Sequence, residues 1–256
     1  MIRLVDESQY NNLLEFCCDN VFGCKIISLF NAYGCNTNFL YFWLQYDSLG
    51  NTTCAICKFD NSITICASNN FDQEEIIQYI YMLSPSSICA PYGVITQIKG
   101  YTSTYGDIMH FESKASIDKL KIDIPKLKDV YGLLSLCKGN DFNIPDFDSF
   151  YVDTSHRIRH NASRCYGIYN KHHDELIASA ITVSETDTCS IIGAVAVHPD
   201  YRKRGLGSYI VLSLANCLKL ENKNVYLLCN SVNNKMFYEK IGFKLCNKWQ
   251  EFYKIV

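Results

Sequence analysis

One stretch of this chain constrains its fold more than any other, because a strand pattern, a glycine-containing loop and a helix pattern follow one another directly. The strand candidate is Cys189–Val197, and Pro199 ends it because proline cannot donate to a sheet ladder. Apolar residues then recur with helical period between Tyr209 and Asn222. This apolar face consists of Ile210, Val211, Leu214, Cys217 and Leu218. The stretch therefore predicts an α/β chain.

The loop in this stretch has the composition of an anion-binding site. Gly205 and Gly207 can adopt backbone conformations that other residues avoid, and they let main-chain N–H groups approach a ligand closely. The cationic side chains of the loop are Arg202, Lys203 and Arg204. Because the loop leads straight into a helix, its free N–H groups lie at the positive end of the helix dipole. The loop suits an anion as large as a pyrophosphate. For a Gly-x-Gly pattern alone, an ordinary surface loop is the alternative.

The spacing of the loop excludes two other phosphate-binding motifs and resembles a third. No Lys-Ser/Thr pair follows Gly207, as a P-loop requires, and the third glycine of a dinucleotide fingerprint is missing. Arg202-x-x-Gly205-x-Gly207 instead resembles the acyl-CoA-binding motif of the GNAT N-acetyltransferase superfamily. Downstream, the sequence from Asn233 to Phe243 resembles the Asn…Phe-Tyr-Glu-Lys-x-Gly-Phe signature of that superfamily. The resemblance covers residues 120–256 and is most specific between residues 191 and 243.

The resemblance implies a GNAT acyl-CoA N-acyltransferase fold, with a mixed, mostly antiparallel sheet flanked by helices. Helix patterns from Pro125 to Leu134 and at residues 148–160 precede strand patterns at 164–169, 176–183 and 189–197, and a helix pattern at 209–222 follows them. The final strands, at 243–249 and 251–256, are expected to form a closing β-hairpin. We expect a catalytic GNAT domain at residues 113–256.

The N-terminal part repeats the same order of elements without the loop motif. Helix patterns at residues 8–20 and 22–33 precede strand patterns at 39–46, 52–59 and 62–67, and a helix follows from Asp72. The turn before that helix reads Ser68-Asn-Asn-Phe71, with neither glycine nor a basic residue. We therefore predict a degenerate GNAT-like domain at residues 1–112, without a CoA site, in tandem with the catalytic domain.

The resemblance also assigns roles to individual residues of the cofactor site. Three strand residues would pair with the pantetheine arm, namely Val195, Ala196 and Val197. The loop residues Arg202, Lys203, Arg204, Gly205, Leu206, Gly207 and Ser208 would hold the pyrophosphate. Asn233 or Asn234 would contact the pantetheine or phosphate region of the cofactor, although a helix N-cap is an equally good role for either. The expected cofactor is acetyl-CoA or another acyl-CoA, and no metal is required.

Tyr238 occupies the position whose hydroxyl, in many relatives, protonates the departing thiolate. A half-buried helical aromatic is the alternative. The general base is harder to assign because the strand Cys189–Val197 contains no carboxylate. Deprotonation through water is our default expectation; His198 is a weaker candidate base, and a solvated loop histidine is the better reading of it.

A basic segment before the next strand is a candidate acceptor site. Its cationic members are Arg157, Arg159 and Arg164, with His156 and His160 between them. A basic lining would suit an acceptor bearing carboxylate or phosphate, whereas a solvated helix face is the alternative. The acceptor is expected to be a small-molecule or peptide amine.

Composition limits the partners of the chain. A net charge of -2 provides no general attraction to nucleic acid or to an anionic membrane. The 14 cysteines are scattered, and no signal peptide precedes them, so we expect reduced thiols in a cytoplasmic protein. Cys54-x-x-Cys57 has no second pair, which favours packed thiols over a zinc site. Whether the chain forms a homodimer is not decided by the sequence.

These observations predict an acetyl-CoA-dependent N-acetyltransferase in which the acceptor amine attacks the acyl carbonyl directly. Two alternatives stay open. A regulatory module could bind acyl-CoA through the same loop without turnover, and the missing carboxylate gives that hypothesis some weight. An aminoacyl or peptidyl transferase could use the tandem fold with a larger acceptor groove.

Overall fold

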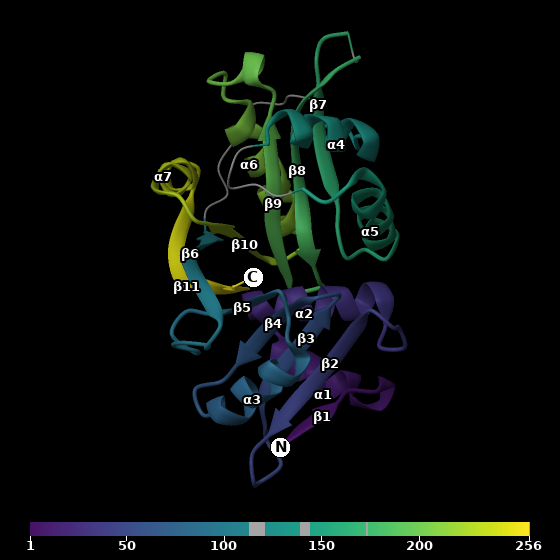
Figure 1. Cartoon of the computed structure of the whole chain (residues 1–256). Coiled ribbons are helices and arrows are strands. Elements are labelled where there is room, and N and C mark those ends of the chain that lie inside the picture. The colour runs from purple at the N-terminus through teal and green to yellow at the C-terminus, as the bar shows by residue number, and fades with distance from the viewer. Residues whose placement is uncertain (113–120, 139–143, 173, 256) are drawn as a thin grey trace. The chain divides into compact units, whose positions relative to one another are not determined.

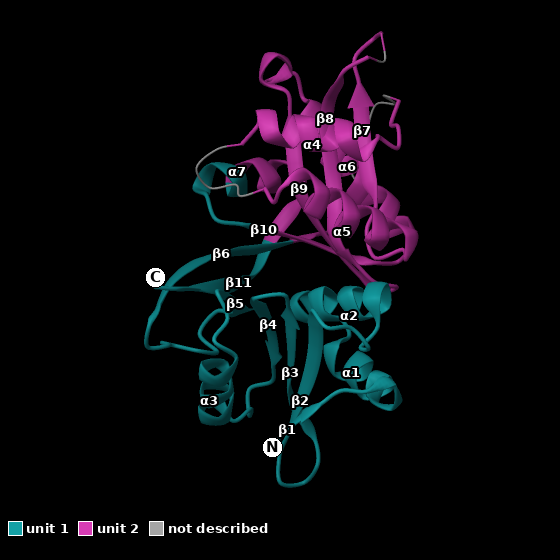
Figure 2. Cartoon of the chain, turned by 45° about the vertical axis from the view of Figure 1, so that its right-hand side comes forward, with its two compact units in different colours: residues 1–109, 228–235, 245–256 teal, residues 110–227, 236–244 magenta. Residues whose placement is uncertain are grey.

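The computed structural model describes residues 1–112, 121–138, 144–172 and 174–255, which fall into two compact units (Figure 2). Unit 1 comprises residues 1–109, 228–235 and 245–256, and unit 2 comprises residues 110–227 and 236–244. The C-terminal segments thus group with the N-terminal part of the chain. The predicted domain boundary at residue 113 lies outside the described residues.

Unit 1 is built on an ordered set of strands with helices packed beside them (Figure 1). Its strands are β1 (Ile2–Leu4), β2 (Leu40–Tyr46), β3 (Thr52–Phe59), β4 (Ser62–Ala67), β5 (Ser87–Pro91) and most of β6 (Tyr101–Phe111) and β11 (Phe243–Lys254). Its helices are η1 (Glu7–Gln9), α1 (Tyr10–Cys17), α2 (Val21–Tyr33) and α3 (Gln73–Leu83). The strand order is β1-β2-β3-β4-β5-β11-β6. Successive strands from β1 to β4 pair antiparallel, β4 pairs parallel with β5, and β5 pairs antiparallel with β11.

Unit 2 repeats this plan with its own helices and strands. Its helices are α4 (Leu127–Leu136), α5 (Phe147–Arg159), η2 (Pro199–Tyr201), α6 (Leu206–Leu220) and the C-terminal part of α7 (Val232–Lys240). Its strands are β7 (Cys165–Tyr169), β8 (Leu176–Glu185), β9 (Cys189–Val197) and most of β10 (Asn224–Cys229). Antiparallel pairing from β7 to β9 is followed by parallel pairing of β9 with β10, across the helix α6. Within the described residues, no helix is both long and apolar enough to cross a membrane.

The two units share the order helix, helix, three antiparallel strands, helix and parallel strand. The sequence predicted this order up to the last helix in both halves, but it did not predict β5, the parallel strand of unit 1. One prediction is wrong: residues 243–254 form the single strand β11 and not a hairpin. No glycine or proline interrupts this segment, so nothing in it supplies a tight turn. Its register with β5 runs from Trp249 opposite Pro91 to Tyr253 opposite Ser87.

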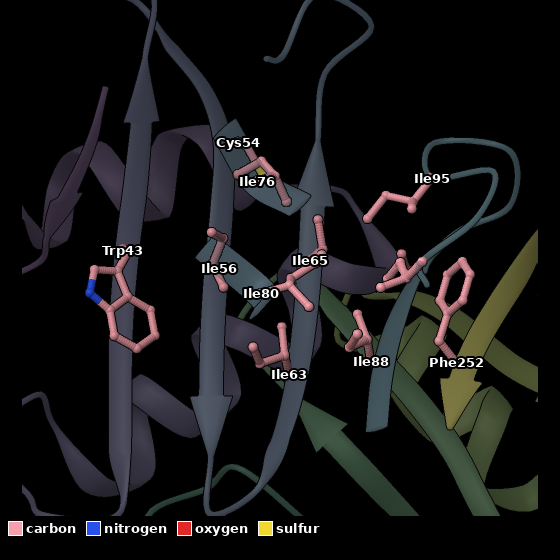
Figure 3. Close-up of a cluster of buried hydrophobic side chains, with 12 residues drawn as sticks. Trp43, Cys54, Ile56, Ile63, Ile65, Ile76, Ile80, Ile88, Ile95 and Phe252 are labelled. Atoms are coloured by element: carbon pink, nitrogen blue, oxygen red, sulfur yellow. The ribbon is translucent and has the colours of Figure 1, made fainter. Parts of the chain in front are cut away.

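One hydrophobic cluster of unit 1 lies between α3 and the sheet (Figure 3). Ile76 and Ile80 of α3 are buried against Ile56 and Ile65 of the sheet, and each fully buried side chain of this size stabilises the fold by about 1.5–3 kcal/mol. The loop after β5 adds Ile95 to the same cluster, which is fully buried.

The core of unit 2 joins α4 and α5 to the strands β7, β8 and β9. Val130 and Leu134 of α4 and Phe150 of α5 pack against Ile181 of β8 and Ala196 of β9. The spacing of these apolar residues explains the two helices, since each presents one apolar face to the sheet. This packing fixes the end of β9, where the predicted cofactor loop begins.

Candidate cofactor site

The strand β9 is irregular where the sequence predicts cofactor binding. Its parallel pairing with β10 runs from Cys189 to Ile192, whereas its antiparallel pairing with β8 continues to Val197. Ala194 has a φ of 47°, a conformation rare for alanine, and the β8–β9 register shifts beside it. The predicted pantetheine-binding residues, Val195 to Val197, thus lie beyond the parallel ladder. A strand edge of this kind can pair with an extended ligand.

The loop after β9 ends in an open helix N-terminus. Gly205 is the N-cap of α6 with a φ of 80°, and no side chain caps the helix there. The first helical hydrogen bond runs from the Tyr209 N–H to the Gly205 carbonyl, at 2.9 Å. The N–H groups of Leu206, Gly207 and Ser208 precede it and have no acceptor within the helix. These three donors can bind an anion.

Gly207 brings three segments of unit 2 together. A methyl group on residue 207 would lie 3.4 Å from Val197 Cγ2 and 3.6 Å from Phe237 Cζ. The first turn of α6 is therefore in contact distance of both the end of β9 and the helix α7. The two sequence motifs, far apart in the chain, meet at this point.

The cationic side chains of the loop differ in their surroundings. Arg202 Nε donates to the Val197 carbonyl at 3.2 Å, and Arg204 Nη2 donates to the Asp200 carbonyl at 2.9 Å. The Arg204 guanidinium also lies over the Tyr201 ring, 5.1 Å from its centroid. Lys203 has a φ of 59° and is exposed. The two arginines are thus tied to their own loop.

His198 is part of the loop structure and is not the solvated histidine that the sequence favoured. Its Nδ1 accepts the Asp200 N–H at 3.3 Å, and its Nε2 lies 3.3 Å from Glu175 Oε1. Only 15% of the side chain is exposed. Both ring nitrogens have protein partners, which argues against His198 as a free base. The sequence gave no sign of Glu175 as a partner, because it precedes a different strand.

Tyr238 lies on α7 in an aromatic cluster of unit 2. Its ring is 5.1 Å from that of Phe237 and 5.8 Å from that of Phe243, which in turn contacts Phe111. Gly242 follows the helix with a φ of 93°, a common way for a helix to end. The side chain is half-buried. This placement is compatible with either predicted role, an acid or a packing aromatic.

Asn233 and Asn234 lie in the first turn of α7, within the segment that groups with unit 1, and both are exposed. Ser231 supplies the cap that was the alternative role for either asparagine, since its hydroxyl accepts the Asn234 N–H at 3.1 Å. A role in cofactor binding stays a prediction for both asparagines.

The basic segment on α5 and β7 is tied to carboxylates. Arg157 forms an ion pair with Asp153 at 3.6 Å and donates to the Val183 carbonyl. Arg164 forms ion pairs with Glu185 and Glu221, and Lys223 adds a contact to Glu185 at 2.6 Å. Arg159 is exposed. The acceptor-binding role stays a prediction, and these ion pairs give Arg157 and Arg164 a structural role.

The ion pairs of Arg164 shift the pKa values of the groups that form them. Its hydrogen bonds lower the pKa of Glu221 from 4.5 to about 2, and the carboxylates raise the pKa of Arg164. Glu185 is 3% exposed and accepts from Thr182 as well as from its two cationic neighbours. The sequence analysis missed this cluster, although a glutamate at the end of a buried strand was a visible signal.

The corresponding helix start in unit 1 has opposite properties. The Asp72 carboxylate caps α3 by accepting the Glu75 N–H at 3.0 Å, and Glu74 and Glu75 add negative charge to the first turn. Gln45, fully buried, bonds to the Asp72 backbone and to Glu75. The first turn of α3 is thus capped by an Asp and carries two glutamates, whereas no side chain caps the first turn of α6.

Comparisons with known proteins identify a matching family and a distant relative. Residues 165–253 match the family described as FR47-like protein. A UPF0039 protein from Schizosaccharomyces pombe is 26% identical over 134 residues, which cover 49% of this chain and 80% of that protein.

Solved structures at low identity share the fold over the whole chain. An X-ray structure of a Drosophila protein has a TM-score of 0.69 at 12% identity and covers 100% of this chain and 99% of that one. A tandem GNAT protein from the clavulanic acid biosynthesis pathway has a TM-score of 0.59 at 12% identity, with 98% and 97% covered. A GNAT-family acetyltransferase from Colwellia psychrerythraea has a TM-score of 0.55 at 11% identity, with 99% of each chain covered. These structures show that the chain has a GNAT fold, and residues 165–253 resemble the FR47-like family.

Proposed function

We propose that the protein is an N-acetyltransferase that transfers an acetyl group from acetyl-CoA to the primary amine of an acceptor by direct attack. The observation that carries this proposal is the glycine-capped, open N-terminus of α6, held against the end of β9. Fourteen free thiols favour a reducing, cytoplasmic setting for this activity.

The residues at this site fit a CoA molecule. The N–H groups of Leu206, Gly207 and Ser208 would hold its pyrophosphate. Gly207 lets the first turn of α6 lie close to Val197 and Phe237. Val195, Ala196 and Val197 would pair with the pantetheine arm along the strand edge. Asn233 or Asn234 would add a polar contact. When bound, acetyl-CoA supplies a thioester carbonyl and a thiolate leaving group.

Tyr238 is our candidate proton donor to the leaving thiolate. A phenol hydroxyl on a half-buried aromatic helix face can be held in one orientation, which general acid catalysis requires. For the base, β9 offers no carboxylate and both nitrogens of His198 have partners. We assign removal of the amine proton to water.

A second candidate function is a regulatory module that binds acyl-CoA without turnover. The absence of a carboxylate on β9 favours this second function, since a protein that only senses the cofactor needs no base. The two functions differ in one measurable property, the release of free thiol in the presence of an acceptor.

The test is an acetyl-CoA consumption screen with amino acids, polyamines, amino sugars and peptides, read by thiol release. The wild-type protein is expected to release thiol with at least one acceptor class, and the Gly205→Asp variant serves as the cofactor-site control. CoA binding without thiol release from any amine pool would support the regulatory module instead. No CoA binding would refute both functions.

A further inference from the structure

The loop between β9 and α6 is held by its own side chains, which we call the loop brace: Glu175, His198, Asp200, Tyr201, Arg202 and Arg204. At one end, Glu175 faces His198 Nε2 at 3.3 Å, and His198 Nδ1 accepts the Asp200 N–H at 3.3 Å. The Tyr201 ring lies edge-on to His198, with centroids 5.5 Å apart. The Arg204 guanidinium covers Tyr201 and donates to the Asp200 carbonyl.

The other end of the brace fixes the last carbonyl of β9. Val197 O accepts from Arg202 Nε at 3.2 Å and from Cys137 Sγ at 3.3 Å. The strand end, the loop and the end of α4 are joined through this one oxygen. A loop tied at both ends keeps the N–H groups of Gly207 and Ser208 in place before any ligand arrives.

We propose that Arg202 and Arg204 are positioning residues, which hold the loop backbone in its anion-binding conformation and do not themselves contact the phosphates of the cofactor. This inference rests on the proposed function, because it concerns how the loop of that same site binds the cofactor. Lys203 and the backbone N–H groups are the direct contacts.

Two physical arguments support these different roles for the two arginines and Lys203. A guanidinium presents its donors in a fixed plane, so a group that bonds to a carbonyl and stacks on a ring has its orientation already set. All three cationic residues are exposed, but Lys203 forms no hydrogen bond or ion pair with any residue that the structure describes. Its flexible ammonium can reach a phosphate as a point charge.

The first test uses the full-length protein without cofactor and compares three single-charge deletions: Arg202→Gln, Arg204→Gln and Lys203→Gln. Hydrogen exchange of the amides at residues 203–208 is followed at millisecond to second labelling times. We expect exchange to become about 3- to 10-fold faster in both arginine variants, as loss of one hydrogen bond predicts, and to stay unchanged in Lys203→Gln. Tyr201→Leu removes the stacked ring without changing charge and should reproduce the Arg204→Gln result.

The second test measures CoA affinity by calorimetry at several salt concentrations. A direct phosphate contact contributes more salt-dependent attraction than a charge that lies near the phosphate without touching it. The arginine variants should therefore bind about 3- to 10-fold more weakly. They should lose less of the salt dependence than Lys203→Gln does. Melting temperatures of all variants identify any that fail to fold.

The outcomes separate the two hypotheses. Unchanged exchange in the arginine variants, together with a loss of salt dependence equal to that of Lys203→Gln, would show that the arginines bind phosphate directly and would overturn the proposal. If the wild-type protein bound no CoA, the proposed function would fail, and the exchange measurement would still decide whether the brace orders the loop.

Discussion

Replacement of Gly205 tests the anion site most directly, because this residue is both the left-handed N-cap of α6 and the centre of the loop. We compare Gly205→Asp with Gly205→Asn and with Lys203→Ala. Asp and Asn have nearly the same shape, and both tolerate a positive φ better than most residues do. A Cβ at residue 205 meets no other atom within 4 Å, so neither variant is excluded by a clash. The two variants therefore differ mainly by one negative charge.

The size of the effect follows from Coulomb's law. Two like charges about 5 Å apart repel by about 1–3 kcal/mol for effective dielectric constants between 80 and 20. An Asp carboxylate at the loop would therefore weaken CoA binding by about 5- to 150-fold relative to Asn. Removal of the exposed Lys203 ammonium costs about 0.2–1 kcal/mol, or less than about 5-fold.

The assay is calorimetric titration with CoA, with melting temperature as the folding control. A carboxylate at the start of a helix is favourable to the helix dipole, so Gly205→Asp should melt no lower than Gly205→Asn. The anion-site reasoning would be refuted if the Asp and Asn variants bound CoA equally well, or if Lys203→Ala weakened binding more than Gly205→Asp.

Three further predictions address other parts of the chain. Since Arg164 lowers the pKa of Glu221 to about 2, the carboxylate stabilises the fold above its ordinary pKa of 4.5 and loses this effect as pH falls toward 2. Because 38% of the side chain is exposed, Glu221→Gln should cost only about 1 kcal/mol at pH 7 and almost nothing near pH 2 in urea unfolding, and an equal cost at both pH values would contradict this. Tyr238→Phe should lower kcat by up to about 10²- to 10⁴-fold with CoA affinity and melting temperature unchanged, and turnover at the parent rate would make Tyr238 a packing residue. Calorimetry should give one CoA per chain, because the α3 start is capped by Asp72, and two CoA per chain would show a second site in unit 1.

Strands and helices that are determined by neighbouring residues were predicted from the sequence. The strands at residues 52–59 and 62–67 were predicted with the bounds observed for β3 and β4, because β-branched and apolar runs there end at Asp60 and Asn61. The helix α6 and its glycine start were also predicted, since apolar period and loop composition agree.

Elements that depend on distant pairing were missed. β5 is a five-residue run without alternation, and most of the first half of β6 is exposed and polar, as a loop would be. β5 pairs with β4 and β11, and β11 also lies beside β6 in the sheet, so these strands exist through contacts between segments far apart in sequence. No local pattern reports such pairing, which is also why residues 243–254 were wrongly predicted to form a hairpin.

The same distinction applies to the candidate site. Backbone features of the loop could be predicted, because glycine at residues 205 and 207 allows backbone conformations and close approaches that other residues avoid. Side-chain roles could not, because charge alone does not tell whether a guanidinium faces solvent, a ligand or its own backbone. The carbonyl partners of Arg202 and Arg204 became visible only in the folded loop.

The two units show how one topology can support a binding site in one copy and exclude it in the other. In both, a helix follows the third antiparallel strand and leads to a parallel one, so its N-terminus lies at the same point of the topology. At α6 that N-terminus is capped by glycine and flanked by cations, and its donors are open. At α3 an Asp caps the helix, two glutamates follow, and Ile95 fills the neighbouring core. Since an anion is attracted to the first arrangement and repelled by the second, we propose that cofactor binding belongs to unit 2.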